Sequence, residues 1–274
     1  MSRPTHAVCS LAALDVRRHP EHRSELTSQL LLGEVVRLAG VSRDGLWWRA
    51  ESLLDGYRGW VRGWGLVPVS GARATRWLRA ARVRVSAPLT LARSRPGGGA
   101  LVSPLFLNSR LIAGRRRGRY RPVELPDGRR GWAEASALRA LGARSPLLAR
   151  VLSLMGVPYL WGGRTPAGFD CSGFTQQVLA EQGVFVPRDA VHQQRASTRL
   201  GRGERPRPGD LVFFAAPRGT ARHVGIGLGG GYYAHCRGFV RISSLDENNP
   251  LCDKDLVSQF RGWWRLPRPG RDTA

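Results

Sequence analysis

The feature that most constrains the fold is an alternation of apolar and polar residues through the first half of the chain. It is clearest in LLGEVVRLAG and LWWRAES, and the pairs Asp44-Gly45 and Asp55-Gly56 mark tight turns between such segments. YRGWVRGWGLVP at 57–68 ends a first block, and DGRRGWAEASAL at 127–138 ends a second block in the same manner. Each block is too short for anything but a small barrel, so the repeat predicts tandem β-rich modules up to about residue 140. The alternative is that both blocks are hairpins of one larger β domain.

The first block resembles bacterial SH3-like barrels through its motif DGYRGWV, and the second block matches them less closely. This resemblance implies a small all-β barrel over residues 1–70 and a second SH3-like barrel over residues 71–141. Gly97-Gly98-Gly99 is expected to be a loop inside the second block under either interpretation.

The pattern changes to helix from residue 145. Ser145-Pro146 is a strong N-cap and first-turn pair ahead of LLARVLSLM, and Gly156 is expected to close this helix in a left-handed cap. A second helix is predicted from about Cys171 to Gln182, with Asp170 as its N-cap and Gly183 as its stop.

Short apolar strands are predicted after these helices: LVFF (211–214), HVGIGL (223–228) and YYAHC (232–236). Helices followed by an antiparallel sheet are typical of an α+β domain. The sequence therefore predicts a third domain over residues 142–274, of α+β class, after the two β modules.

The net charge of +23 comes from 43 basic and 20 acidic side chains, and Lys254 is the only lysine. Such a charge attracts polyanions, but a nearly pure arginine bias is typical of genome composition, so no specific nucleic-acid partner is expected. The run from Arg115 to Arg119 is interpreted as a solvated turn. No apolar stretch is long enough to span a bilayer, so membrane insertion is not expected. The oligomeric state stays open.

The four cysteines are too few and too scattered for a disulfide framework or a zinc ribbon. Asp15 and the basic run from Arg17 to His19 interrupt any signal-peptide core near the N-terminus. Free thiols in a reducing cytoplasm are therefore the expectation, and export by an unrecognised route is the alternative.

Cys171 lies at a predicted helix start, where backbone N–H groups and the helix dipole are expected to lower the thiol pKa. A nucleophilic thiolate needs an imidazole partner and a third group that orients the imidazole. If Gly229-Gly230-Gly231 form a turn with Leu228 opposite Tyr232, His223 lies one diagonal step from His235, so both point at one site. A one-residue change in this loop would separate them. A buried core cysteine and ordinary strand histidines are the alternative.

Five motifs follow one another in the second half of the chain: YLWGGRTPAGFDCSGFTQQV (159–178), PRDAVHQQ (187–194), RPGDLVFF (207–214), HVGIGLGGG (223–231) and AHC (234–236). This series resembles the NlpC-type family of peptidoglycan cysteine endopeptidases over about residues 145–265. The resemblance implies a papain-like fold, a triad of Cys171, His223 and His235, and cleavage next to D-glutamate in murein stem peptides. It also implies that Tyr159 lies by the nucleophile and helps to hold the oxyanion, whereas the alternative is a packed core tyrosine. No metal or cofactor is required.

The β modules followed by PRDA resemble the branch of this family that recycles wall fragments. That branch cuts L-Ala-γ-D-Glu from meso-diaminopimelate or L-Lys when the alanine amine is free. The resemblance implies that Asp189 binds this ammonium, and that Glu25 and Tyr57 of the first barrel close the same end of the site. Ser172 is expected to hold the substrate carboxylate, or else to be a helix-start hydroxyl. A surface carboxylate is the alternative for Glu25, and the choice between diaminopimelate and lysine stays open.

Two positions depart from the family pattern. Gly227 replaces a frequent aromatic residue and is expected to widen the groove. Cys236 replaces a common Ala or Ser and is expected to add a thiol that can be oxidised near the site.

Two other functions compete with the peptidase. The barrels could dock on wall polymer while the C-terminal domain is inactive, or a papain-like core could act as an amidase or acyltransferase. The intact set of Cys171, His223 and His235 favours the peptidase, and the PRDA and DCSG motifs favour murein peptides as its substrate.

Overall fold

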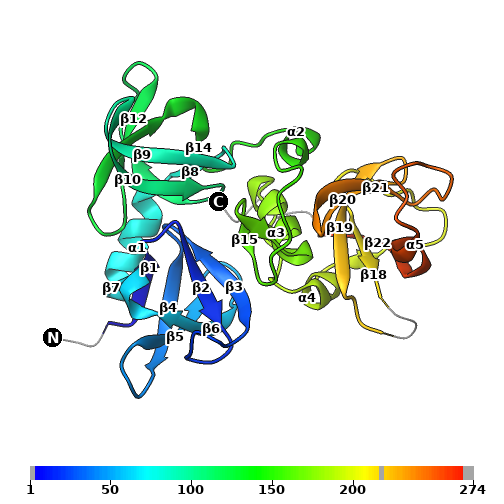
Figure 1. Cartoon of the computed structure of the whole chain (residues 1–274), viewed down its shortest axis with the longest axis horizontal. Helices are drawn as coiled ribbons and strands as arrows, with labels where there is room; N and C mark the ends of the chain where they lie inside the picture. Colours follow the sequence, from blue (N-terminus) through cyan, green and yellow to red (C-terminus); the bar gives the residue numbers. More distant parts are fainter. Residues whose placement is uncertain (1–3, 216–218, 268–274) are drawn as a thin grey trace. The chain divides into compact units, whose positions relative to one another are not determined.

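The computed structural model describes residues 4–215 and 219–267, and the chain forms two compact units that divide between Ala143 and Arg144 (Figure 1). The outermost parts of the predicted first and third domains, residues 1–3 and 268–274, lie outside the described residues. No helix within the described ranges is long and apolar enough to cross a membrane.

The N-terminal unit begins with a seven-stranded antiparallel sheet in the order β3-β2-β6-β5-β4-β1-β7. Alternating side chains of these strands point inward and form a closed apolar core that includes Cys9, Val36 and Val61. The strands are β1 (His6–Cys9), β2 (Ala13–Arg17), β3 (Leu26–Leu31), β4 (Val35–Val41), β5 (Trp47–Ser52), β6 (Arg58–Arg62) and β7 (Leu66–Val69), with a 3₁₀ turn η1 (Gly63–Gly65) before β7.

A second seven-stranded sheet follows, in the order β10-β9-β13-β12-β11-β8-β14. Advancing every strand of the first sheet by seven gives this order, so the two halves of the unit share one topology. Its core includes Val85, Leu105 and Leu111. The strands are β8 (Val83–Val85), β9 (Leu89–Arg95), β10 (Gly98–Phe106), β11 (Arg110–Ala113), β12 (Tyr120–Glu124), β13 (Arg130–Glu134) and β14 (Leu138–Ala140), with η2 (Ala135–Ala137) before β14.

The Gly-Trp pair that recurs in the sequence lies on equivalent strands, β6 and β13. A Cβ on Gly59 would lie 2.3 Å from Val16 Cγ1, and a Cβ on Gly131 would lie 3.0 Å from the Arg93 carbonyl oxygen. In each sheet the neighbouring strand approaches too closely for a side chain at this position, which gives the repeated glycine a steric cause.

The expectation of strands alone up to residue 140 is wrong at one place, because α1 (Gly71–Ala80) lies between the two sheets. The Ser70 hydroxyl caps this helix by accepting from the Arg73 N–H. Ala74, Trp77 and Leu78 pack on Val8 and Val35, and Trp77 Nε1 donates to the Gly33 carbonyl at 2.9 Å. The loop predicted at Gly97-Gly98-Gly99 is in fact a short turn at Pro96-Gly97, and β10 starts at Gly98.

The C-terminal unit is an α+β domain in which α3 packs against a six-stranded sheet of order β17-β22-β18-β19-β20-β21 (Figure 1). The strand order and helix placement confirm the predicted α+β class. Its helices are α2 (Leu147–Leu152), α3 (Cys171–Glu181), α4 (Ala190–Arg195) and α5 (Lys254–Ser258). Its strands are β15 (Arg164–Thr165), β16 (Gly168–Phe169), β17 (Thr198–Arg199), β18 (Leu211–Phe214), β19 (His223–Gly229), β20 (Tyr232–Arg237), β21 (Phe239–Ser244) and β22 (Phe260–Arg265).

The start of α2 differs from the prediction. Pro146 occupies the N-cap position, and the Ser145 hydroxyl donates to Glu181 Oε1 at 2.9 Å instead of capping the helix. Glu181 is buried and also binds Arg150, so the serine completes a buried charged group. Gly156 has a positive φ, as expected, but lies four residues beyond the end of α2.

Candidate active site

Cys171 is the first residue of α3, as predicted, and its local structure explains that position. Asp170 is the N-cap, and its Oδ1 accepts from the Gly173 N–H at 2.6 Å. A Cβ on Gly173 would lie 2.1 Å from the Gly163 carbonyl oxygen, so the Trp-Gly-Gly loop lies directly on the first turn of the helix. The motif glycines therefore fix where the thiol of Cys171 lies.

His223 and His235 lie together on neighbouring strands. The turn consists of Gly230 and Gly231 with Gly229 opposite Tyr232, which is one residue away from the predicted pairing. A β-bulge between Gly227 and Gly229 compensates for this change, so Gly225 pairs with His235 and the predicted parity is kept. His223 Nε2 lies 2.8 Å from His235 Nδ1.

Ser243 extends this pair into a chain of three side chains. Its Oγ lies 3.1 Å from His235 Nε2, and His235 is fully buried. If His235 Nε2 donates to Ser243, then His235 Nδ1 accepts from His223 Nε2, which leaves His223 Nδ1 unprotonated. This tautomer presents the second nitrogen of His223 as a base. Sequence reasoning missed Ser243. His235 on β20 lies opposite Arg241 on β21, and Ser243 is two residues further along β21, so its side chain points to the same face of the sheet as His235.

The electrostatics of the pair differ from the expectation of an acidic thiol. Burial, and next the negative charge of Asp170, raise the pKa of Cys171 to about 12, against smaller opposing effects from backbone N–H groups and Arg188. Burial, and next the charge of Arg237, lower the pKa of His223 to about 4. Burial and the neighbouring His223 lower the pKa of His235 to about 2. At neutral pH the resting site therefore holds a neutral thiol and neutral imidazoles.

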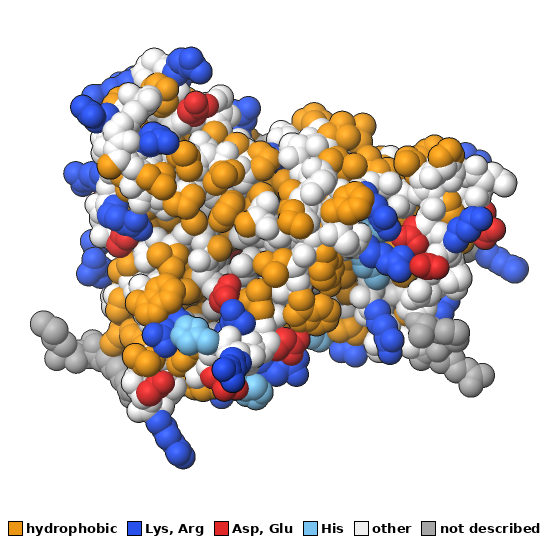
Figure 2. Space-filling model, in the orientation of Figure 1, with side chains coloured by type: hydrophobic (Ala, Val, Ile, Leu, Met, Phe, Trp, Pro, Cys, Tyr) orange, Lys and Arg blue, Asp and Glu red, His pale blue; other side chains and the backbone are white. Residues whose placement is uncertain are grey.

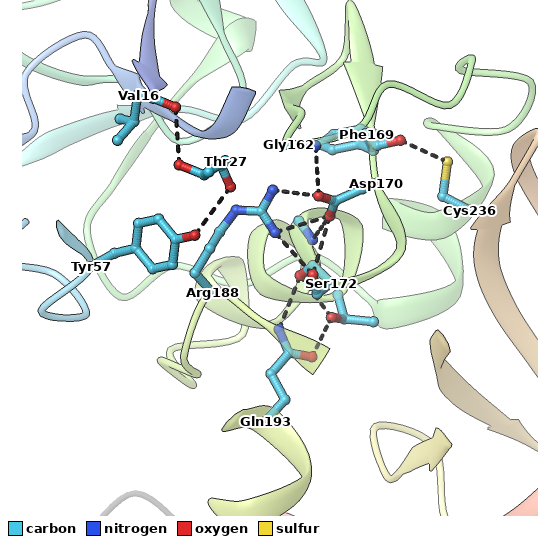
Figure 3. Close-up of polar contacts among 12 residues, drawn as sticks. Val16, Thr27, Tyr57, Gly162, Phe169, Asp170, Ser172, Arg188, Gln193 and Cys236 are labelled. Atoms are coloured by element: carbon cyan, nitrogen blue, oxygen red, sulfur yellow. Dashed lines mark hydrogen bonds and ion pairs between the residues drawn. The ribbon is translucent and has the colours of Figure 1, made fainter. Parts of the chain in front are cut away.

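A buried ion pair supports the first turn of α3, and sequence reasoning missed its basic partner, Arg188. The Arg188 side chain is 1% exposed, and it donates to both carboxylate oxygens of Asp170, at 3.0 and 2.5 Å. It also donates to Ser172 Oγ at 2.9 Å (Figure 3). Arg188 lies within the PRDA motif, and that motif is the signal that could have drawn attention to it.

Ser172 belongs to this buried group. Its residue is 5% exposed, and its hydroxyl contacts Asp170 Oδ1 as well as Arg188. Gln193 of α4 donates to the Ser172 carbonyl at 3.0 Å (Figure 3). It also donates to the Pro187 carbonyl at 2.9 Å, which ties the PRDA segment to α3. These contacts fit the alternative expectation for Ser172, which is a hydroxyl that supports the start of a helix.

Tyr159 lies close to the nucleophile. Burial, and next the charges of Cys171 and Asp170, raise the pKa of its hydroxyl above the ordinary value, so it remains a hydrogen-bond donor. Its backbone N–H donates to the Gly238 carbonyl at 2.8 Å. The residue is 37% exposed, so it is not the packed core tyrosine that the alternative interpretation required.

The predicted substrate-binding acids have the following local surroundings. Asp189 occupies the N-cap position of α4, its side chain is 40% exposed, and its Oδ2 lies 3.5 Å from His192 Nδ1. In the N-terminal unit, Glu25 forms an ion pair with Arg18 at 2.7 Å. Tyr57 packs against the core of the first sheet, and its hydroxyl lies 3.5 Å from the Thr27 carbonyl.

The two departures from the family pattern have structural explanations that differ from those expected. A Cβ on Gly227 would lie 2.8 Å from Trp263 Cζ3, so the indole fills the space and no wider groove results. Cys236 is fully buried, its thiol donates to the Phe169 carbonyl at 3.2 Å, and burial raises its pKa to about 12. Such a protonated, inaccessible thiol is a poor target for oxidation.

All four cysteines are free, as expected. No cluster of three or more metal-ligating side chains occurs in the described ranges.

Comparison with known proteins agrees with this geometry. Residues 156–259 match the NlpC/P60 family, and residues 16–65 match the bacterial dipeptidyl-peptidase SH3 domain. A gamma-D-glutamyl-L-lysine dipeptidyl-peptidase of Bacillus cereus is 30% identical over 150 residues, which cover 51% of this chain and 44% of that protein. A probable endopeptidase p60 of Listeria innocua is 44% identical over 85 residues, which cover 31% of this chain and 18% of that protein. The chain thus spans less than half the length of these relatives.

The crystal structure of an NlpC/P60 family protein from Bacillus cereus has the same fold. It superimposes with a TM-score of 0.81 at 22% identity and covers 96% of this chain and 100% of that one. The match therefore includes the β-rich N-terminal unit as well as the α+β unit that holds Cys171 and the two histidines. The C-terminal unit thus contains an NlpC/P60 domain over residues 156–259, and a bacterial dipeptidyl-peptidase SH3 domain precedes it over residues 16–65.

Proposed function

We propose that this chain is a cysteine peptidase that hydrolyses the bond between γ-D-glutamate and the L-diamino acid of murein stem peptides. The observation that carries the proposal is the 2.8 Å contact between His223 Nε2 and His235 Nδ1, on strands that lie against the helix starting at Cys171. With the proton of His223 on Nε2, this contact leaves His223 Nδ1 free to act as the base. The names of the relatives from Bacillus cereus and Bacillus subtilis support the same bond as the substrate.

The reaction follows from these positions. His223 Nδ1 takes the proton of the Cys171 thiol as the sulfur attacks the γ-glutamyl carbonyl carbon. The Tyr159 hydroxyl and the Cys171 backbone N–H donate to the oxygen that becomes negative. His223 then gives the proton to the leaving amine, and the acyl group remains on sulfur as a thioester. Water that is deprotonated by His223 attacks the thioester, and the thiol returns.

His235 and Ser243 act on His223 rather than on the substrate. Their hydrogen bonds hold the imidazole in the tautomer that carries its proton on Nε2, and they stabilise the imidazolium that forms during attack. We therefore assign His235 and Ser243 as positioning residues.

We further propose that the substrate carries a free N-terminal L-Ala, and that Asp189 binds its ammonium. The partly exposed carboxylate of Asp189 follows directly after Arg188, whose guanidinium supports the helix of Cys171. Acylation would remove the positive charge that attracts this carboxylate, and this disfavours an N-acylated peptide. The roles of Glu25 and Tyr57 at this end of the peptide, and the cytoplasmic location, stay predictions.

The experiment incubates the protein with L-Ala-γ-D-Glu-diaminopimelate and with its N-acetylated form, and follows the products by mass spectrometry. We expect release of L-Ala-γ-D-Glu from the free peptide and little or none from the acetylated one. Cys171→Ala should abolish release, and Asp189→Asn should raise KM for the free peptide. Glu247→Gln, which removes an exposed carboxylate elsewhere on the unit, is the matched control. Equal cleavage of both peptides would refute the requirement for a free amine, and cleavage of neither would favour a binding module.

A further inference from the structure

Tyr233 carries a buried hydroxyl on the same strand as His235, and the proposed reaction gives this hydroxyl no role. The two residues are two positions apart on β20, so their side chains point to the same face of the sheet. Tyr233 is fully buried, and its hydroxyl has no well-formed hydrogen bond in the described part of the chain. Buried hydroxyls in proteins are normally hydrogen-bonded, so this one requires an explanation.

Packing fixes the Tyr233 ring beside His235. Gly225 lies opposite His235 on β19, and a Cβ on this glycine would lie 3.0 Å from Tyr233 Cδ2. The missing side chain therefore leaves the space that the tyrosine ring occupies. The centroid of this ring lies 5.0 Å from that of His235 and 5.3 Å from that of Phe214. Because rings on both sides hold it, the tyrosine has little freedom to turn its hydroxyl away from the histidine pair.

Ser243 lies between the phenol and the imidazole. It is directly opposite Tyr233 in the register of β20 and β21, and such residues have Cβ atoms about 5 Å apart. Its Oγ also lies 3.1 Å from His235 Nε2. Burial, and next the charge of Asp253, raise the pKa of the Tyr233 hydroxyl, while hydrogen bonding from Ser243 acts in the opposite direction. A donor to the phenol oxygen has this effect, so Ser243 is within reach of that oxygen.

Protein groups rather than solvent determine the direction of these hydrogen bonds. Figure 2 shows a histidine at the surface of this unit, next to acidic and basic side chains. By contrast, His235 and Tyr233 are fully buried and Ser243 is 3% exposed. Bulk water therefore does not compete for the serine hydroxyl, and its proton points either to the imidazole or to the phenol.

These two directions have opposite consequences for the base. If Ser243 donates to His235 Nε2, the proton of His235 is on Nδ1 and is donated to His223 Nε2, so His223 Nδ1 is protonated and cannot act as a base. If Ser243 donates to Tyr233, its oxygen accepts from His235 Nε2, and His223 Nδ1 is left unprotonated. Only the second direction produces the tautomer that the proposed reaction uses.

We propose that Tyr233 is a positioning residue, which accepts the hydroxyl proton of Ser243 in a hydrogen bond and so holds His223 in the tautomer whose Nδ1 is the base. Every donor in the resulting chain points away from His223, so the same arrangement also stabilises the imidazolium that forms during attack. The inference rests on the proposed function for its kinetic consequence, whereas the tautomer itself is a property of the resting protein.

The first test is NMR of the full chain with isotope-labelled histidine nitrogens, which distinguishes protonated from unprotonated ring nitrogens. We expect both His223 and His235 to carry their proton on Nε2. Tyr233→Phe keeps the ring and removes the acceptor, so it should produce a mixture with the Nδ1-protonated tautomers. Tyr232→Phe is the matched control, because it removes a hydroxyl from the adjacent residue on the other face of β20, where that oxygen accepts from Asn249 Nδ2 at 2.8 Å. It should leave the tautomers unchanged.

The second test is the kinetics of the same variants with L-Ala-γ-D-Glu-diaminopimelate. If the two tautomers become equally populated in Tyr233→Phe, half of the molecules hold the base, so kcat should fall about twofold at constant KM, and further if the wrong tautomer prevails. Because Tyr233 acts through Ser243, adding Tyr233→Phe to Ser243→Ala should cause no further loss. A merely structural tyrosine would not produce this pattern.

Three results would overturn the assignment of Tyr233. They are a protonated His223 Nδ1 in the unsubstituted protein, unchanged tautomers in a folded Tyr233→Phe, and losses in kcat that multiply in the double variant. The first of these needs no substitution, so the proposal can be refuted even if Tyr233→Phe does not fold. Cleavage of no peptide by the unsubstituted protein would instead overturn the proposed function, and the NMR measurement would still decide the tautomer.

Discussion

Replacing Arg188 by glutamine should destabilise the C-terminal unit far more than an ordinary loss of an ion pair. The two side chains of the pair are 1% and 10% exposed, and the guanidinium makes two contacts to Asp170 and one to Ser172. Removing one partner of such a buried pair leaves the other charge uncompensated and costs about 3 to 5 kcal/mol. In a unit of this size, that cost corresponds to a fall in Tm of roughly 10 to 20 °C.

The assay is scanning calorimetry of the full chain, in which each unit serves as the reference for a substitution in the other. Arg130→Gln is the matched control, because Arg130 and Glu124 form an ion pair with side chains 79% and 38% exposed in the N-terminal unit. Such an exposed pair contributes about 1 kcal/mol or less. We expect one transition to shift strongly in Arg188→Gln and neither to shift appreciably in Arg130→Gln.

A double substitution measures the interaction between the two charges of the pair. Asp170→Asn with Arg188→Gln removes both charges, so its cost should be smaller than the sum of the two single costs by at least 1 kcal/mol. A loss of less than about 1 kcal/mol in Arg188→Gln, or strict additivity in the double variant, would refute the view that this pair supports the first turn of α3.

Three further predictions concern the same unit. Ser243→Ala should lower kcat several-fold with little change in KM and should alter the acidic limb of the pH profile, whereas a purely structural serine would alter neither. The free energy of unfolding should fall as the pH drops below 6.5, by about 2 kcal/mol per histidine at pH 5. His223 and His235 have folded-state pKa values of about 4 and about 2, so in this pH range both histidines bind protons in the unfolded chain but not in the folded one. Denaturation at a series of pH values tests this, and a flat profile would contradict it. Gly173→Ala should abolish activity and lower Tm, because the added Cβ meets the Gly163 carbonyl at 2.1 Å; unchanged activity would show that the loop can move away.

Short-range sequence patterns were sufficient for the start of α3 and the two histidines, although they failed for the N-cap of α2. Asp170 as N-cap, Cys171 as the first helical residue and the parity of the two histidines follow from short-range rules of capping and pleating, and all three are present. The turn itself was placed one residue wrongly. The bulge at Leu228 offsets that error, and no local rule predicts a bulge of this kind.

Residues that depend on tertiary packing were missed. Arg188 is a charged residue in a position where sequence statistics predict exposure, and its burial makes sense only once α4 and the first turn of α3 are side by side. Ser243 comes from a strand that follows the last recognised motif, and the sheet brings it to His235. The helix α1 is missed because the alternation in the two flanking blocks predicts strands up to about residue 140.

The sign of the thiol pKa shift shows why local reasoning fails at the reactive atom itself. A helix start stabilises an adjacent negative charge by about 0.3 to 1 kcal/mol. The rise in the pKa of Cys171 from 9.0 to about 12 corresponds to about 4 kcal/mol in the opposite direction, and burial is its largest cause. Burial therefore prevails over the helix start, and the position of Cys171 on α3 cannot by itself produce a thiolate. In the proposed mechanism the thiol is activated by proton transfer to His223 during attack, and the contacts of His235 and Ser243 orient the imidazole that takes the proton.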